Sequence, residues 1–398
     1  MKKAISLLLA LSLLLPVFSL AEEDDDLMVE EIVEEVILED EAADALPDLD
    51  SEDIIYDEDT GEIFLLTEEE QQKLDSILEE EPEEDDTGIN PDSLDLNTNL
   101  PDNVINILLI GVDTRSSDPM EIIGRGDTQI IVSVNKDTGD VKMTSILRDS
   151  LVTIPGYKNQ TKINNAFQYG CNRVKKGETK DKIHGGAALA MRTINKNFQM
   201  NIENYVAINF NGLASIIDAL GGIDIELTKA EATYINSYLK KHPPAYDNRA
   251  KGERVPLEAV AGVQHLDGVQ AVMYARTRSL NGENDFNRTD RQRHLLELLL
   301  EKVMQDLDFS TLMDLIDVAI SYSDTNMNFQ TMFNLAASLM PSLAGASSDE
   351  ALFEQMRIPM DKSYSYATVN GASVLKYNMK KHAQAIHEFV YGTYYPAD

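Results

Sequence analysis

VINILLIGVDTR, residues 104–115, is an apolar run that is too short and too β-branched to form a helix. Turn-forming residues flank the run, so we expect a buried strand that ends at Gly111. Two further strand-like runs follow, QIIVSVN (129–135) and VKMTSIL (141–147), and the turn 136–139 separates them. This spacing predicts an antiparallel hairpin beside the first strand.

Strand-like and helix-like segments alternate through the rest of the folded part. We expect strands at 205–210, 223–227 and 353–358, and helices at 186–197, 212–220, 311–320, 329–339 and 377–390. Residues 230–260 are polar and should form a surface excursion. The alternation predicts a mixed-sheet α/β/α sandwich, and about 298 residues are ample for its core.

Charge is distributed very unevenly along the chain. Residues 22–95 hold 34 acidic side chains and one base, Lys73, whereas residues 96–398 have a net charge of only −4. Repulsion between so many acidic side chains prevents this segment from collapsing into a core. We therefore expect a disordered acidic spacer here. The absence of a basic stripe argues against nucleic acid as a partner.

The amino terminus has the plan of an export signal. Lys2 and Lys3 precede an uncharged apolar stretch, residues 4–21, which indicates a secretory signal peptide or an uncleaved membrane anchor. Either reading places the chain outside the membrane, where the single cysteine, Cys171, rules out disulfides as the support of the fold. The expected organisation is a signal peptide or anchor at 1–21, a spacer at 22–100 and a catalytic domain at 101–395.

The hairpin topology brings charged residues together. An antiparallel hairpin places the start of its first strand, with Arg125 and Asp127, beside the end of its second, with Arg148. Asp113, at the exit of the preceding strand, should join them at the same sheet edge. Two carboxylates can hold a divalent ion such as Mg²⁺, while arginines stabilise charge on phosphate oxygens. Taken alone, two aspartates near strand ends are more often caps or turn formers.

Arginines accumulate without lysine in YARTRSLNGENDFNRTDRQR, residues 274–293. Their planar forks match a pyrophosphate. A helix should begin at about Arg288, with Arg288 and Gln292 on one face and Arg293 pointing away. The alternative is an ordinary solvated surface on which the arginines pair with acidic neighbours. The five arginines are Arg276, Arg278, Arg288, Arg291 and Arg293, and the acidic neighbours are Glu283, Asp285 and Asp290.

Eight motifs, in order, resemble the LytR-CpsA-Psr family. They are GVDTR (111–115), RGDT (125–128), SILRDS (145–150), KINNAF (162–167), YVAINF (205–210), ALGGIDIEL (219–227), DGVQAVMYARTR (267–278) and DFNRTDRQR (285–293). The resemblance implies a phosphotransferase that moves a glycopolymer, such as a teichoic acid or capsular polysaccharide, from an undecaprenyl-pyrophosphate carrier to peptidoglycan. It further implies Mg²⁺ or Mn²⁺ as cofactor and action at the outer surface of the membrane.

The resemblance also assigns roles by motif. It implies metal binding by Asp113 and Asp127, catalytic roles for these two and for Arg148, Arg276 and Arg278, and pyrophosphate binding by Arg125, Lys162, Asp285, Arg288 and Gln292. Two positions depart from the family pattern, because Gly126 replaces a serine and Leu147 replaces a proline.

Two other functions are compatible with the same residues. One is a catalytically silent scaffold that binds polyprenyl phosphates or glycans, and the other is a pyrophosphatase in which water is the acceptor. Retention of both aspartates and all the arginines favours the transferase. A lipid-binding groove should then run from the arginines into the core.

Overall fold

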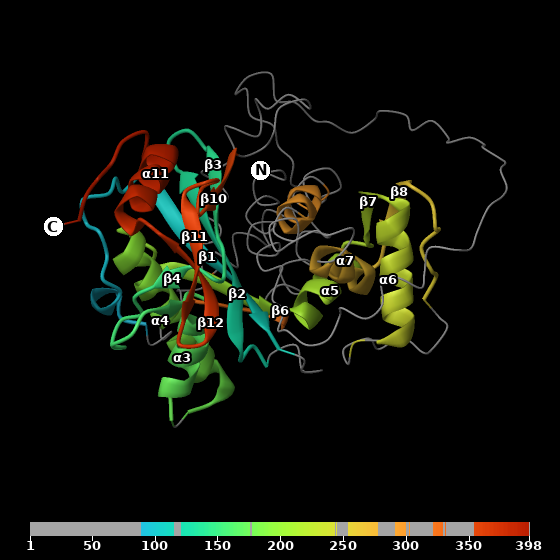
Figure 1. Ribbon diagram of the computed structural model, residues 1–398, viewed down its shortest axis with the longest axis horizontal. Helices are drawn as coiled ribbons and strands as arrows, with labels where there is room; N and C mark the ends of the chain where they lie inside the picture. Colours follow the sequence, from blue (N-terminus) through green and yellow to red (C-terminus); the bar gives the residue numbers. More distant parts are fainter. Residues whose placement is uncertain are drawn as a thin grey trace, which may run out of the picture.

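The strand expected at 104–111 lies in the middle of a six-stranded mixed sheet with the order β10-β3-β2-β1-β6-β9 (Figure 1). The computed structural model describes residues 89–114, 121–175, 177–242, 244, 254–277, 291–299, 302, 321–328, 331 and 354–397. The strands are β1 (Val104–Asp113), β2 (Arg125–Asn135), β3 (Val141–Ile146), β6 (Asn204–Asn209), β9 (Ser323–Thr325) and β10 (Glu354–Ile358).

The sheet contains both kinds of pairing. β2 pairs antiparallel with β1 and with β3, as the hairpin pattern predicted, and β9 pairs antiparallel with β6. β6 runs parallel to β1, and β10 runs parallel to β3. Successive side chains of β1 enter two different cores, Ile107 and Leu109 on one face and Leu108 and Ile110 on the other. Burial on both faces explains why this strand is apolar throughout instead of alternating.

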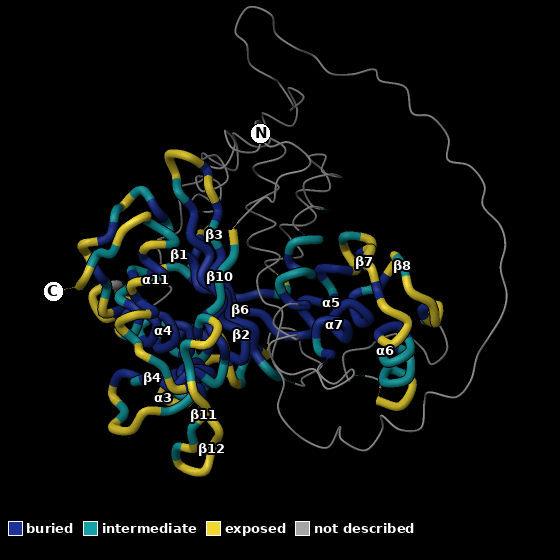
Figure 2. The backbone as a smooth tube through the Cα atoms, turned by 45° about the horizontal axis from the view of Figure 1, so that its top comes forward, coloured by how far each residue is buried: buried dark blue, intermediate teal, exposed yellow. Residues whose placement is uncertain are grey.

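Helices cover both faces of the sheet, which confirms the predicted α/β/α sandwich (Figure 1). One face carries α3 (Asn165–Arg173), α4 (Thr179–Phe198) and α11 (Met379–Tyr391). The other carries α5 (Phe210–Ala219), α6 (Lys229–Lys241), α7 (Gly268–Arg276) and the helical residues 291–299. Figure 2 shows buried residues concentrated along the central strands and the helices that flank them.

Short elements complete the described fold. These are η1 (Pro91–Ser93) and the pairs β4 (Leu151–Val152) with β5 (Thr161–Lys162), β7 (Ile223–Leu227) with β8 (Gly262–Leu266), and β11 (Tyr364–Val369) with β12 (Ala372–Tyr377). The helices expected at 311–320 and 329–339 lie almost entirely outside the described residues.

Two helices differ from the sequence expectation. α4 begins at Thr179, seven residues before the predicted start, because Glu178 and Asp181 form a capping box. α6 occupies residues that were expected to be a polar excursion. Its start is fixed by a capping box between Thr228 and Glu231, and its apolar face is short, which conceals the helical period within a polar sequence.

The folded part reaches further toward the amino terminus than the expected boundary at residue 101. Leu94 is buried with 1% exposure, and its carbonyl accepts a 3.0 Å hydrogen bond from the Asn195 side chain. Asp95 forms a forked ion pair with Arg192, at 2.9 and 3.2 Å. Residues 89–100 therefore belong with the domain. Among the described residues, no helix is both long and apolar enough to cross a bilayer, and the segment 1–21 is not among them.

Candidate active site

Asp127 is the extra residue of a β-bulge between β1 and β2. Gly111 pairs with Thr128, but the next residue, Val112, pairs with Gly126, so Asp127 has no partner in the ladder. Bulges redirect a side chain that regular pairing would place elsewhere. A Cβ at Gly126 would lie 3.1 Å from Ile110 and 3.2 Å from Phe167, so the absence of a side chain relieves crowding beside the bulge.

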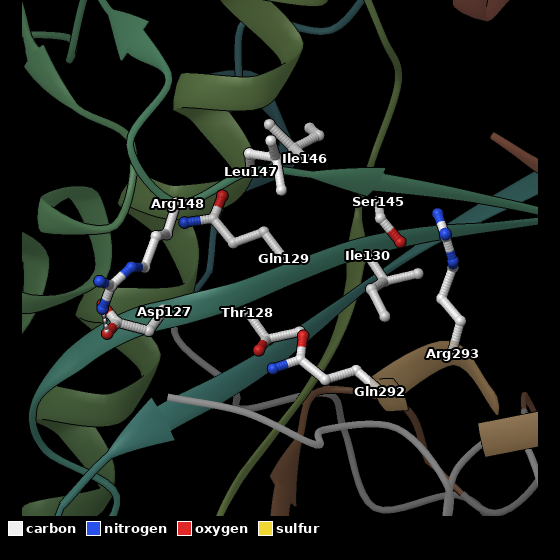
Figure 3. A pocket seen from close by; sticks show the side chains of 10 residues that line it. All are labelled: Asp127, Thr128, Gln129, Ile130, Ser145, Ile146, Leu147, Arg148, Gln292 and Arg293. Carbon is white, nitrogen blue, oxygen red and sulfur yellow. Dashed lines mark hydrogen bonds and ion pairs between the residues drawn. The ribbon is translucent and has the colours of Figure 1, made fainter. Parts of the chain in front are cut away.

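The Asp127 carboxylate is buried and held from two sides. Arg148 Nη1 donates to Oδ2 at 2.7 Å (Figure 3). Asn164 Nδ2 donates to Oδ1 at 2.6 Å. Asp127 is only 5% exposed. Charge-assisted hydrogen bonds in a site shielded from water fix both groups strongly. The structure thus confirms the juxtaposition of Asp127 and Arg148 that the hairpin predicted.

Three further predicted residues lie around this pair. Asp113 is directly opposite Arg125 in the β1–β2 register, with Asp113 half-buried and Arg125 exposed. Lys162, on β5, forms a 2.7 Å ion pair with Asp149, the residue after Arg148. Lys162 is also two residues before Asn164, so the same short segment contributes to both contacts. The predicted convergence of these charges at one end of the sheet is confirmed.

Arg276 approaches the same edge from the opposite helical layer. Its guanidinium lies over the Phe210 ring, 4.7 Å from the centroid, at the carboxyl end of α7. Phe210 directly follows β6, whose last residue, Asn209, pairs with Val112. Arg276 Nε is buried and has no hydrogen-bond partner among the described atoms. An arginine fixed by stacking, with an unused donor, is prepared to bind an anion.

Arg291 has a different role from the one its position in the arginine-rich stretch suggested. Its Nε donates to Glu231 on α6 at 2.8 Å, and its Nη1 donates to the Thr277 carbonyl at 3.2 Å. Burial raises the pKa of Glu231, but hydrogen bonds from Thr228 and Arg291 outweigh it, so the pKa lies below its ordinary value. Arg291 therefore ties the end of α7 and the helix 291–299 to α6.

The remainder of the arginine-rich stretch is beyond what the structure describes. Arg278, Asp285 and Arg288 lie in residues 278–290, so their roles stay predictions. The alternative in which arginines pair with carboxylates holds for Arg291, although its partner is the buried Glu231 and not an acidic neighbour in the sequence.

A small pocket opens between the β2–β3 hairpin and the helix 291–299. Asp127 and Arg148 lie at one end in Figure 3, and Arg293 lies at the other. Ser145 Oγ and Gln292 Nε2 belong to pocket-lining residues and have no hydrogen-bond partner among the described atoms. Both residues are at least nine-tenths buried. Buried polar atoms without partners are costly, so these two favour a polar ligand.

The pocket bears on two expectations. Arg293 lines it together with Gln292, so Arg293 lies near the site, while its predicted direction away from the face of Arg288 and Gln292 stays a prediction because Arg288 is outside the described residues. The cavity holds only about 10 Å³, about one water molecule. The part of the chain that the structure describes thus does not show the long lipid groove that we expected beside the arginines.

A metal at this site would depend on Asp113 and Asp127. Among the described residues there is no cluster of three or more His, Cys, Asp or Glu side chains that could hold an ion. Mg²⁺ needs only one or two protein carboxylates when water and phosphate oxygens supply the remaining ligands. Asp113 and Asp127 supply two carboxylates at the same end of the β1–β2 pair, so the donor set fits a hard cation.

Sequence reasoning missed Asn164 and Ser145. Asn164 is within the motif KINNAF, but nothing in the local sequence shows that its amide reaches a strand 37 residues earlier. Strand alternation could have identified Ser145, because it places this residue on the same face as Val141 and Met143 and therefore toward the pocket. Leu147, at the position where the family has proline, donates its backbone N–H to Ile358 at 2.8 Å, a hydrogen bond that proline cannot form.

The sequence has recognisable relatives. The model of the LytR_cpsA_psr family matches residues 64–388, so the match begins within the acidic segment. A polyisoprenyl-teichoic acid–peptidoglycan teichoic acid transferase, TagU, of Enterococcus faecalis is 28% identical over 61% of this chain and 68% of its own length. Biofilm regulatory protein A of Streptococcus mutans is 31% identical over 61% of this chain and 53% of its own length. The matched segment thus spans about half to two thirds of the length of these relatives.

Solved structures share the fold. A protein from Streptococcus agalactiae superposes with a TM-score of 0.54 at 24% identity, covering 72% of this chain and 86% of that one. TagV of B. subtilis superposes with a TM-score of 0.52 at 22% identity, covering 75% of this chain and all of that one. At these identities the likeness establishes the mixed-sheet architecture alone.

Proposed function

Because the chain belongs to the LytR-CpsA-Psr family, we propose that it transfers a teichoic-acid-like glycopolymer from a polyprenyl-pyrophosphate carrier to peptidoglycan outside the membrane. The name of the E. faecalis relative, a teichoic acid transferase acting on peptidoglycan, supports this substrate class. The observation that carries the proposal is the buried Asp127 carboxylate, fixed by Arg148 and Asn164 beside polar groups that face a pocket.

The reaction needs negative charge to be stabilised at two places. A hydroxyl oxygen of peptidoglycan would attack the phosphorus that carries the glycan, and the bond from that phosphorus to the bridging oxygen would break. The hydroxyl proton leaves to solvent or a base, and polyprenyl phosphate departs with the bond electrons. Arg125, Arg148 and Arg276 converge on one sheet edge, where their charges can compensate both the attacked phosphate and the leaving phosphate.

Asp113 and Asp127 would hold the divalent cation in this proposal. When bound, Mg²⁺ or Mn²⁺ would supply Lewis-acid polarisation of a phosphate oxygen. Arg148 and Asn164 would orient the Asp127 carboxylate, as residues behind a metal ligand commonly do. Ser145 and Gln292 would position an anionic oxygen in the pocket through their buried donors.

The segment 1–21, with its paired lysines followed by apolar residues, supports action outside the membrane. Lys2 and Lys3 would stay on the cytoplasmic side if the segment is retained as an anchor. The acidic residues 22–88 would then hold the domain away from an anionic surface.

Substitution of Asp127 by asparagine tests the proposal. Asp127→Asn keeps the shape of the side chain and removes the charge that faces Arg148, so transfer should fall by roughly 100-fold or more. The matched control is Asp224→Asn on β7, whose side chain is exposed and pairs with the exposed His265. Breaking a buried ion pair also costs stability, about 3–5 kcal/mol, so melting temperature must be recorded alongside activity.

The assay should follow two products with and without Mg²⁺, namely released polyprenyl phosphate and labelled glycan attached to peptidoglycan. Release without attachment would mean hydrolysis, and binding without release would mean a silent scaffold. Wild-type transfer by a folded Asp127→Asn protein would refute the assigned role of Asp127. Undiminished transfer in EDTA would refute the role of the metal.

A further inference from the structure

A second and larger cavity lies at the opposite end of the central strands. It holds about 470 Å³ and is formed by the start of β1, the turn between β2 and β3, and the end of α11. Small-molecule sites typically span about 300–1,000 Å³, so this cavity can accept a ligand of several rings. In Figure 1, α11 (red) lies beside the β3 end of the sheet, and Lys142 Nζ joins the two by donating to the Phe389 carbonyl at 2.8 Å.

One wall of the cavity is rigid. Ser133 Oγ donates to Asn106 Oδ1 at 2.6 Å, and Asn106 Nδ2 donates to the Tyr391 hydroxyl at 2.7 Å. Ser133 and Asn106 are buried, so this chain of hydrogen bonds fixes the Tyr391 ring. The Tyr395 ring meets the Tyr391 ring edge-on, with 5.9 Å between centroids. Two partly exposed tyrosines thus offer apolar surface with polar tips to whatever enters.

The charged groups of the cavity are one base, Lys142, and one acid, Asp140, and the base already has a carboxylate partner. Lys142 is neutralised by Glu354 at 3.4 Å and lies 5.2 Å from the centre of the Phe389 ring. Asp140 is the one acidic residue of the lining, and it is exposed. A phosphate would find no uncompensated cation here, in contrast to the site around Asp127 and Arg148. The lining therefore disfavours an anionic ligand and is compatible with an uncharged one.

The lining offers both donors and acceptors. Asn103 uses its amide nitrogen to bind Asp137 at 2.7 Å, which leaves its amide oxygen as an acceptor. Asn135 uses its amide oxygen to accept from Asp137 N at 2.9 Å, which leaves its amide nitrogen as a donor. The Tyr391 hydroxyl accepts from Asn106 and keeps its own proton for donation. A ligand with many hydroxyl groups matches this mixed pattern, because each hydroxyl can donate and accept.

We infer that this cavity is a second binding site, specific for a short uncharged oligosaccharide. Its tyrosines would pack against sugar rings, and Asn103, Asn135 and Asp140 would bind sugar hydroxyls. The site lies one full strand from Asp113, because β1 runs from Val104 at the cavity to Asp113 at the other end. At about 3.3 Å per residue the separation is about 30 Å. A glycan strand can span that distance.

The saccharide inference rests on the cavity alone, while its use in transfer rests on the proposed function. If both hold, the cavity retains one glycan while its distant end meets the Asp127 site. Oligosaccharide binding by an inactive protein, or transfer by a protein that binds no oligosaccharide, would separate the two claims.

Titration of the full chain with N-acetylchitotetraose, followed by calorimetry and by saturation-transfer NMR, tests the inference. The wild type should bind the tetrasaccharide, and Tyr395→Ala should weaken binding by about tenfold through loss of one aromatic contact. Asp140→Ala, at an exposed turn position, should weaken it as well without changing the core. Tyr366→Ala is the matched control, because Tyr366 is 67% exposed on β11 and lies outside the cavity.

Asp127→Asn should bind the tetrasaccharide as the wild type does, which separates this site from the proposed catalytic one. Inorganic pyrophosphate should not compete with the sugar. The inference is overturned if the wild type shows no binding at millimolar tetrasaccharide. It is equally overturned if Tyr395→Ala and Asp140→Ala both bind like Tyr366→Ala, or if pyrophosphate displaces the sugar.

Discussion

Replacing Arg276 and Arg291 by lysine, one at a time, should separate binding from folding within one arginine-rich stretch. The two residues lie at the two described ends of that stretch, and both keep a positive charge when changed to lysine. Arg276 stacks on Phe210 and has a buried Nε without a hydrogen-bond partner among the described atoms, whereas Arg291 binds Glu231 and the Thr277 carbonyl. The same change to lysine should therefore lower turnover at Arg276 and stability at Arg291.

For Arg276→Lys the expected loss is in turnover. A guanidinium can bind two phosphate oxygens at once, and an ammonium replaces that fork by a single point charge. One charge-assisted hydrogen bond contributes about 1.5–3 kcal/mol, so kcat/KM should fall by about ten- to a hundredfold. The lost stacking on Phe210 is worth only about 0.5–1 kcal/mol, so the melting temperature should fall by a few degrees at most.

For Arg291→Lys the expected loss is in stability. At least one of its two hydrogen bonds disappears in a buried setting, at a cost of about 1.5–3 kcal/mol and a fall in melting temperature of roughly 3–8 °C. Turnover per folded molecule should stay within about twofold of the wild type, since Arg291 faces Glu231 and not the Asp127 pair.

Steady-state release of polyprenyl phosphate and thermal unfolding of the same preparations measure both effects. The reasoning fails if Arg276→Lys works at the wild-type rate, since the cluster would then act only through its overall charge. It fails too if Arg291→Lys loses turnover while its melting temperature is unchanged.

Two further outcomes follow from the same contacts. Glu231→Gln should lower the free energy of unfolding at pH 7, and this loss should shrink as the pH falls below about 4.5. The reason is that the lowered pKa of Glu231 gives stability that is present above the ordinary value of 4.5 and is lost on protonation. Glu226→Gln, exposed on β7, is the control, and a loss that does not depend on pH would contradict the ion pair. Deleting residues 22–88 should leave the melting temperature within about 2 °C of the wild-type value. Extending the deletion to residue 100 removes the buried Leu94 and Leu100, each worth about 1.5–3 kcal/mol, and should lower the melting temperature by roughly 5 °C or more in calorimetry. Equal melting temperatures for the two deletions would mean that residues 89–100 contribute nothing to stability.

The sequence predicted those parts of the site that follow from strand pairing. Continuous apolar runs identified β1, β2 and β3, and hairpin geometry alone placed Arg148 beside Asp127. Both inferences depend on neighbours in the sequence, for which periodicity and turn residues are sufficient.

Contacts between distant segments were beyond such reasoning. Glu231 lies 60 residues from Arg291, in a segment whose polar composition concealed a helix, so the true partner of that arginine was invisible. That Arg293 lines the pocket was not foreseen, because helical spacing gives the direction of a side chain but not the extent of the pocket that it meets.

The bulge at Asp127 makes the site depend on one extra residue of β2 relative to β1. From Val104 to Gly111, β1 pairs with β2 in one register, which ends with Gly111 opposite Thr128. From Val112 the register is shifted by one residue, with Val112 opposite Gly126. Removing a single residue at the bulge would restore an unbroken ladder with no extra residue, so the bulge would no longer direct the Asp127 side chain. Insertions and deletions of one residue should therefore be far more damaging here than side-chain replacements. Arg125 would keep its place opposite Asp113 after such a deletion, because these two residues already pair in the register beyond the bulge.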